Sequence, residues 1–185
     1  VDGKTTVLDQ PFLVMATQNP LEFHGTYPLP ESQLDRFLMR LQVGYPDASH
    51  EREIIMRAQG HDTAEDLNPV TTPADVVALQ EACDRVRVDG AVVDYLHEIV
   101  VETRNSQFLA LGCSPRGAQA LLRACRARAV VEGRPYCLPD DVKALVLPVL
   151  AHRMRLAGRQ DDIASARDEA ERVIRDILER VPVPT

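Results

Sequence analysis

Residues 37–59, FLMRLQVGYPDASHEREIIMRAQ, contain the change of pattern that decides the fold. As far as Val43 the apolar residues run almost without interruption, as in a buried strand, and the turn-forming letters GYP end the run. After Pro46 the apolar residues recur at helical spacing, behind a capping residue at Asp47 or Ser49. The stretch therefore predicts a strand joined to a helical region, with the junction near residue 46.

Upstream of this junction the sequence favours one edge of an α/β domain. Residues 12–17, FLVMAT, form a continuous apolar run, which predicts a strand buried on both faces, as in the centre of a parallel sheet. A loop rich in Gly and Pro over 25–30 and a brief helix around 32–36 separate it from the strand over 37–43. Two strands do not make a stable sheet alone, so we expect the remaining strands of the sheet to precede residue 1.

Downstream of the junction, capping and stop signals predict a series of helices. The expected helices start at Asp47 or Ser49, Thr72-Pro73, Asp89, Ser114-Pro115 and Pro139, and the last one covers about 163–180. Gly133 is typical of a helix C-terminus, and Pro148 is expected to interrupt or kink its helix because it lacks an amide donor. The side chains expected to face inward are Val92, Val93, Leu96, Ile99, Val100, Leu121, Leu122, Cys125, Val173, Ile174, Ile177 and Leu178.

The composition bounds the class of protein. Of the 185 residues 45% are hydrophobic, only 4% are aromatic and none is Trp, so the core must be aliphatic, which helix packing provides most easily. The formal charge of −7 argues against a duplex nucleic-acid partner, because neutralised phosphates supply most of that affinity. No window approaches the roughly 18 apolar residues that a membrane span needs, so no membrane partner is expected.

The four cysteines are Cys83, Cys113, Cys125 and Cys137. No pair has a CxxC spacing and no His lies at ligand spacing beside them, which argues against a zinc site. Two disulfides in a secreted protein are one alternative. The absence of a recognisable signal peptide favours four reduced, mostly buried thiols in a cytoplasmic protein.

The first polar signal is Asn19, within ATQNP at the end of the first predicted strand. The carboxyl ends of parallel strands are where α/β sheets bind ligands, and an amide there can orient a water against a terminal phosphate. The alternative is an Asn that caps the turn before Pro20.

The second signal is Arg36, which lies in PLPESQLDRF just before the second predicted strand. An arginine is always cationic and donates through a planar fork, which suits charge that develops on a transferring phosphoryl group. The alternative is a local ion pair with Asp35 or Glu31.

The third signal is Arg116, in SPRG at the start of a predicted helix. A cation in the first turn opposes the helix dipole at a cost of ~0.3–1 kcal/mol, which hints at a role beyond helix stability. The alternative is an ordinary surface arginine.

Together, the order and spacing of these motifs resemble the MoxR family of AAA+ ATPases. ATQNP, GTYPLPESQLDRF and GYP are similar to the second half of the family's nucleotide-binding domain, and SPRG, EGRPY, DDV and VLAHRM are similar to its lid. The VPVP ending also fits. The resemblance implies a mainly α fold, in which a C-terminal remnant of an AAA+ α/β core over 1–46 is followed by an all-helical lid domain over 47–185.

The resemblance also implies roles for particular residues. Asn19 would be sensor 1, which positions the attacking water, and Arg116 would be sensor 2, which brings the lid down on the nucleotide. Arg36 would be the arginine finger that reaches the ATP site of a neighbouring subunit. Asp35 would hold the geometry of that finger at the subunit interface, where Glu31 is also expected.

The implied cofactors are ATP and Mg2+, and the implied assembly is a homo-oligomer, a hexameric ring. Such a protein would couple ATP hydrolysis to chaperone-like remodelling or metal-cofactor insertion in a client, in some cases with a metal-binding partner domain alongside. Residues 1–185 contain no GxxxxGK[ST] loop and no apolar strand ending in Asp-Glu before the sensor strand. We therefore expect them not to hydrolyse ATP alone.

Two hypotheses from other functional classes remain. A non-catalytic helical protein-interaction module would give Asn19 and Arg116 no reason to face a common cleft. A DNA motor is disfavoured by the acidic balance, and salt-dependent DNA binding would revive it.

Overall fold

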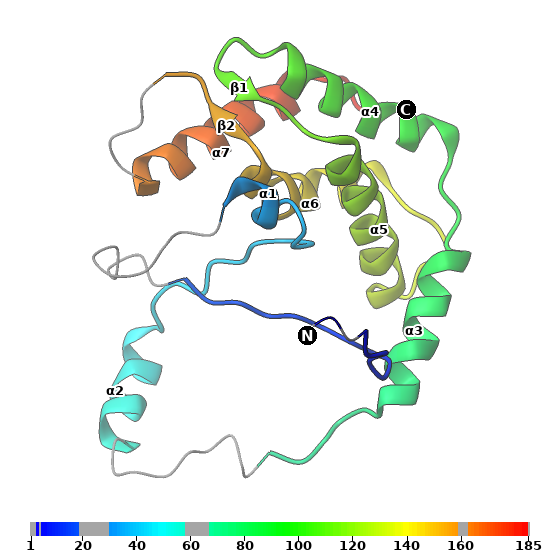
Figure 1. The fold of residues 1–185 in the computed structure, drawn as a ribbon, viewed down its shortest axis with the longest axis vertical. Coiled ribbons are helices and arrows are strands. Elements are labelled where there is room, and N and C mark those ends of the chain that lie inside the picture. The colour runs from blue at the N-terminus through cyan, green and yellow to red at the C-terminus, as the bar shows by residue number, and fades with distance from the viewer. Residues whose placement is uncertain (1–2, 4, 19–29, 58–66, 159–162, 185) are drawn as a thin grey trace.

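The computed structural model describes residues 3, 5–18, 30–57, 67–158 and 163–184 (Figure 1). The elements in chain order are α1 (Glu31–Leu34), α2 (Ala48–Arg57), α3 (Pro73–Arg85), α4 (Gly90–Asn105), β1 (Leu109–Leu111), α5 (Pro115–Val131), α6 (Pro139–Leu150), the 3-10 helix η1 (Ala151–Arg153), β2 (Arg155–Leu156) and α7 (Ile163–Arg180). The expected mainly α architecture is confirmed.

The predicted helix starts are confirmed, because each cap is a local interaction. Thr72 accepts from the backbone N–H of Asp75, whose carboxylate accepts from the N–H of Thr72 at 2.9 Å, a reciprocal capping box. Asp89 accepts from the N–H of Ala91 at 2.9 Å and caps the start of α4. Gly133 adopts φ 69° just after α5, as a helix stop requires.

The core is aliphatic and lies among the helices from α4 to α7. Helix α5 packs against α3, α4 and α6, and α7 packs against α4 and α6. The largest fully buried apolar side chains include Ile99, Leu121, Leu150, Ile174 and Ile177. One predicted core position is wrong: Val93 is 40% exposed, since it lies at the edge of the apolar stripe of α4.

Two local features differ from expectation. Helix α6 continues through Pro148 to Leu150 and then tightens into η1, so the proline does not interrupt it. The short antiparallel pair of β1 and β2, in which Leu109 lies opposite Leu156, has no signal in the sequence pattern.

The two predicted N-terminal strands are not formed. In the described parts of the chain, residues 12–17 and 37–43 are assigned to no strand and have no ladder partner. Met15 is 85% exposed and Val43 is 98% exposed, so the expected burial on both faces is also wrong. A strand becomes regular only when a neighbour satisfies its N–H and C=O groups, and the described chain supplies none.

Figure 1 shows the described N-terminal segment running below the helical body, with α2 standing apart from it at the lower left. Among the described residues, no helix is both long and apolar enough to cross a bilayer.

Candidate functional site

A buried arginine joins the N-terminal segment to the helical body. Arg153 lies in η1 and its side chain is only 2% exposed. Its Nε donates to the carbonyl of Val149 at 2.8 Å, within its own helical region. Nη1 donates to the carbonyl and to Oδ1 of Asp35 at 2.6 and 2.9 Å, and Nη2 donates to the carbonyls of Phe37 and Leu38. These acceptors account for the five N–H donors that an arginine has.

The carboxylate of Asp35 has a second partner. Ser114 caps α5 by accepting from the N–H of Gly117 at 3.0 Å, and its hydroxyl donates to Oδ1 of Asp35 at 3.1 Å. One carboxylate oxygen therefore contacts both the start of α5 and Arg153. We call Asp35, Ser114 and Arg153 the clamp.

Gly117, the last residue of SPRG, leaves the space that Arg153 occupies. A Cβ added there would lie 2.9 Å from the Cys113 Sγ and 3.3 Å from the Arg153 Cδ. Any side chain at this position would push against the stem of the buried guanidinium. The motif thus has a packing role that its sequence does not reveal.

The loop before α5 is also fixed to α4. The N–H of Cys113 donates to the hydroxyl of Thr103 at 3.0 Å, and Arg104 Nε donates to the carbonyl of Cys113 at 2.8 Å. A Cβ on Gly112 would lie 2.6 Å from the Thr103 carbonyl oxygen, so only glycine fits this approach. Burial raises the pKa of the Cys113 thiol to about 11, which keeps it protonated and makes it a poor nucleophile.

The histidine next to Arg153 contacts the same N-terminal segment. His152 Nε2 lies 3.2 Å from the carbonyl of Phe37, and Nδ1 is buried without a partner among the described residues. Burial lowers the pKa of His152. The neutral ring protonated on Nε2 is therefore the form that fits, with Nε2 donating to the Phe37 carbonyl.

Two further contacts hold the segment that follows. The N–H of Arg40 donates to the Pro148 carbonyl at 2.8 Å, and its side chain pairs with Glu171 on α7 at 3.3 Å. The stretch from Asp35 to Arg40 is thus attached to α6, η1 and α7 although it contains no regular element.

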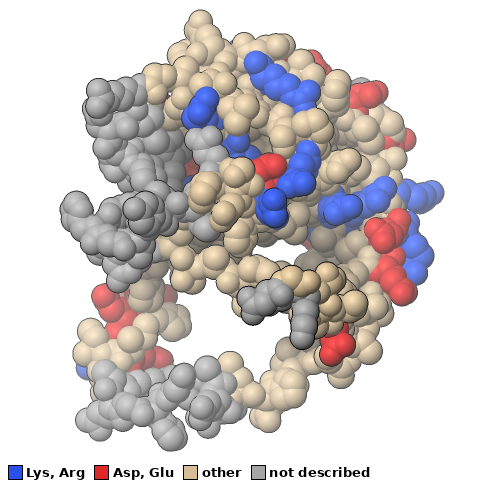
Figure 2. All heavy atoms as spheres, viewed as in Figure 1, with Lys and Arg blue, Asp and Glu red and all other residues tan. Residues whose placement is uncertain are grey.

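Each of the two motif arginines lies close in sequence to one clamp residue. Arg36 directly follows Asp35, and Arg116 is in the first turn of α5, two residues after Ser114; both are exposed. Neither pairs with another described side chain, and the carboxylate of Asp35, one alternative partner for Arg36, is bound to Arg153 instead. Figure 2 shows basic side chains gathered on this face over the region where Figure 1 draws α1 and the start of α5.

Some predicted site residues cannot be placed. Asn19 lies outside the described residues, and so does the side chain of Glu31. The contacts of Asp35 are within its own chain, so its expected role at a subunit interface stays a prediction. Sequence reasoning missed Arg153 and His152, although both lie in the quoted VLAHRM motif.

The arrangement suits a phosphate better than a metal ion. Exposed guanidinium groups at Arg36 and Arg116 can donate to phosphate oxygens through a planar fork. Among the described residues, no three His, Cys, Asp or Glu side chains are grouped so that they could hold a metal ion.

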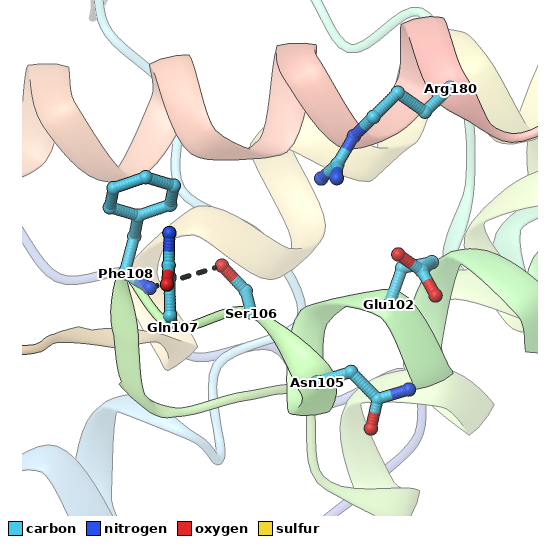
Figure 3. Close-up of a pocket in the computed structure, with 6 residues that line it drawn as sticks. All are labelled: Glu102, Asn105, Ser106, Gln107, Phe108 and Arg180. Atoms are coloured by element: carbon cyan, nitrogen blue, oxygen red, sulfur yellow. Dashed lines mark hydrogen bonds between the residues drawn. The ribbon is translucent and has the colours of Figure 1, made fainter.

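A separate shallow cavity of about 230 Å³ lies between the end of α4 and the last turn of α7 (Figure 3). Glu102 and Asn105 come from α4, residues 106–108 from the loop that follows, and Arg180 from α7. It shares no lining residue with the clamp.

Two family models match parts of the chain. The AAA lid domain model matches residues 101–177, and the model of the ATPase family associated with various cellular activities (AAA) matches residues 1–39. The clamp therefore joins the two matched regions, since Asp35 lies in one and Ser114 and Arg153 lie in the other.

Curated relatives match the whole length of the chain or nearly so. It is 42% identical over 184 residues to the uncharacterised protein YeaC of Bacillus subtilis, across 100% of this chain and 57% of that protein. It is 38% identical over 193 residues to Chaperone MoxR1 of Mycobacterium tuberculosis, across 100% and 50%. Protein MoxR of Paracoccus denitrificans is 33% identical over 190 residues, across 92% and 56%. The chain spans about half the length of these relatives.

A solved structure has the same fold. The crystal structure of a candidate ATPase from Cytophaga hutchinsonii superposes with a TM-score of 0.82 at 32% sequence identity, across 100% of this chain and 58% of that chain.

Proposed function

Because this chain belongs to the MoxR family of AAA+ ATPases, we propose that it is part of an ATP-hydrolysing protein. In this proposal, the chain carries the two sensor residues and the arginine finger. The full protein would couple ATP binding and hydrolysis to chaperone-like remodelling, or to metal-cofactor insertion, in a client protein. We assign residues 1–46 to the end of the AAA+ core and residues 47–185 to the lid.

Each predicted site residue has a stated task in this proposal. Arg116 donates to phosphate oxygens of ATP bound in its own subunit, so that the lid follows the state of the nucleotide. Arg36 stabilises charge in the site of the neighbouring subunit, and Asn19 orients the attacking water in its own subunit. The exposure of both arginines supports these tasks, because a buried or paired guanidinium could not reach a phosphate.

ATP fits this donor set, whereas Mg2+ has no ligand group among the described residues. Bound ATP would supply the phosphoryl group that is transferred to water. The loop and carboxylates that hold Mg2+ and the phosphates are expected outside the 185 residues, so we derive no step through the metal. Residues 1–185 alone should release no phosphate from ATP.

A finger that acts in a neighbour's site requires an oligomer, for which we propose the hexameric ring expected from the family. Head-to-tail contacts generate a closed ring when the rotation between subunits closes. We propose a cytoplasmic location, in agreement with four free cysteines, three of them buried. The client protein and a metal-binding partner domain belong to the same proposal.

The observation that carries the proposal is the exposure of Arg36 beside a fixed Asp35. In the full-length protein, Arg36→Ala should preserve ATP binding and reduce turnover by about 10³–10⁵, as loss of such a finger does in related phosphoryl-transfer enzymes. Unchanged turnover with unchanged assembly would remove the finger assignment. A full-length parent protein without ATP turnover would instead favour a non-catalytic helical interaction module.

A further inference from the structure

The acceptors of Arg153 surround one position in the sequence. Apart from the Val149 carbonyl, they are the carbonyls of residues 35, 37 and 38 and the carboxylate of Asp35, so these four enclose Arg36 on both sides. The Arg36 side chain itself is exposed. The backbone that bears this side chain is therefore fixed by a guanidinium 118 residues away from Asp35 in sequence.

Besides the contacts with Arg153, the stretch is held by short turn hydrogen bonds within residues 33–37 and by the contacts of Arg40. Helix α1 ends at Leu34 after four residues, and residues 39–47 form no regular element. A one-turn helix is not stable by itself, because nucleation costs more than one hydrogen bond returns. The contacts with η1 therefore contribute to the direction in which Arg36 leaves the backbone.

The same carboxylate connects this stretch to the start of α5. Ser114 donates to Asp35 and caps the helix whose first turn carries Arg116. A shift of the α5 start that moved Ser114 would change the environment of the carboxylate that Arg153 holds. The clamp therefore forms a direct physical link between the arginine that contacts a subunit's own nucleotide and the one that serves its neighbour.

We propose that Arg153 is a positioning residue: through Asp35 and the carbonyls on either side of position 36, it aims Arg36 at the neighbouring ATP site. The proposal rests on the proposed role of Arg36 as a finger in trans. The simpler alternative is a purely structural role for Arg153. It would stabilise the fold without any specific effect on the finger.

The two alternatives differ in what a conservative change does. Lysine keeps the charge of Arg153 but has three donors on a flexible stem, so Arg153→Lys cannot satisfy all the acceptors at once. In the full-length protein we expect Arg153→Lys to leave ATP affinity unchanged and to lower kcat roughly 10–100-fold, the usual cost of a small misplacement of a reacting group.

Arg134 provides the matched control. It pairs through both Nη atoms with the buried carboxylate of Asp141, at 2.6 and 3.0 Å, and also donates to the Tyr136 carbonyl. Arg134→Lys damages a comparable arginine–aspartate pair that has no contact with residues 35–38. It should lower the thermal midpoint about as much as Arg153→Lys while the kcat of the folded enzyme is kept.

Mixing variant subunits tests the direction of the effect. Arg153→Lys subunits mixed with Arg116→Ala subunits should regain turnover at about a quarter of the interfaces, because one supplies an intact site and the other an intact finger. Arg153→Lys mixed with Arg36→Ala should regain none, since both lack a working finger. Hydrogen exchange without nucleotide should show faster amide exchange at residues 35–40 in Arg153→Lys and not in Arg134→Lys.

The proposal is overturned if Arg153→Lys and Arg36→Ala subunits restore each other, if Arg153→Lys weakens ATP binding instead of kcat, or if its kcat matches that of Arg134→Lys. These outcomes are distinct from failure of the proposed function. If the proposed function fails, Arg36→Ala itself keeps full turnover.

Discussion

Ser114 and Asp35, 79 residues apart in sequence, share a 3.1 Å hydrogen bond in which the cap of α5 donates to the residue before Arg36. The same serine hydroxyl also accepts a hydrogen bond from the N–H of Gly117. The residue before Arg36 and the cap of the helix that carries Arg116 are therefore in direct contact.

Ser114→Ala should destabilise the protein more than loss of a cap alone. A lost cap costs about 0.5–2 kcal/mol, and here the Asp35 carboxylate also loses a donor. The control is Thr72→Ala on α3, whose capping box is exposed and local. Denaturant unfolding should rank Ser114→Ala as the more costly change, and equal costs would mean that the contact with Asp35 contributes no more than the exposed contact of Thr72 with Asp75.

Gly117→Ala should destabilise the protein by about 1–3 kcal/mol, because the new methyl group meets the Cys113 sulfur and the Arg153 stem. Gly90→Ala, in the first turn of α4, is the matched control because a Cβ added there would have nothing within 4 Å. That change should be neutral or stabilise by about 0.4–1 kcal/mol. Thermal or urea unfolding of both variants measures the difference, and equal midpoints would contradict the packing account.

Asp141→Ala should cost about 3–5 kcal/mol, since it removes one partner of a buried ion pair. The Asp141 side chain is 2% exposed and bound by Arg134. Asp140→Ala is the neighbouring control, because Asp140 is 80% exposed in its pair with Lys143 and should contribute about 0–1 kcal/mol. Urea unfolding should separate the two variants clearly.

The pH dependence of stability should include a contribution from His152. Burial lowers its pKa from the ordinary value of 6.5, so between the two values the unfolded chain binds more protons than the folded one. This part of the stability is complete above 6.5 and is lost as the pH falls from there toward the folded pKa. Arg40, Arg153 and Asp35 also face the ring.

His152→Gln keeps an N–H donor for the Phe37 carbonyl and removes the titration. The loss of stability between about pH 7.5 and pH 5.5 should therefore be smaller in this variant than in the parent. His97→Gln, an exposed position on α4, should leave the loss unchanged. Parallel curves for His152→Gln and the parent would show that the buried ring is not responsible.

The helical part of the fold could be predicted because its signals are local. Thr72, Asp89 and Ser114 each bond to a backbone N–H within three residues, so the sequence alone contains the interaction. The strands over 12–17 and 37–43 failed for the opposite reason. Their apolar pattern indicates burial, but a ladder needs a partner that the described chain does not provide.

The candidate site, too, could be predicted only where its signals are local in the sequence. Arg36 and Arg116 could be found from motifs, and their exposure agrees with a role in binding. Arg153 could not, because four of its five acceptors lie 115 to 118 residues away and no sequence pattern pairs them. Gly117 has a packing role that becomes visible only when the side chain of Arg153 is placed beside it.

The most direct test of the central claim is ATP turnover by mixed subunits of the full-length protein. Arg36→Ala and Arg116→Ala are each expected to be nearly inactive alone, one lacking the finger and the other the contact with its own nucleotide. A mixture of the two should regain turnover, because interfaces with an intact site facing an intact finger form by chance. A mixture no faster than its separate components, with mixed assemblies shown to form, would contradict the account.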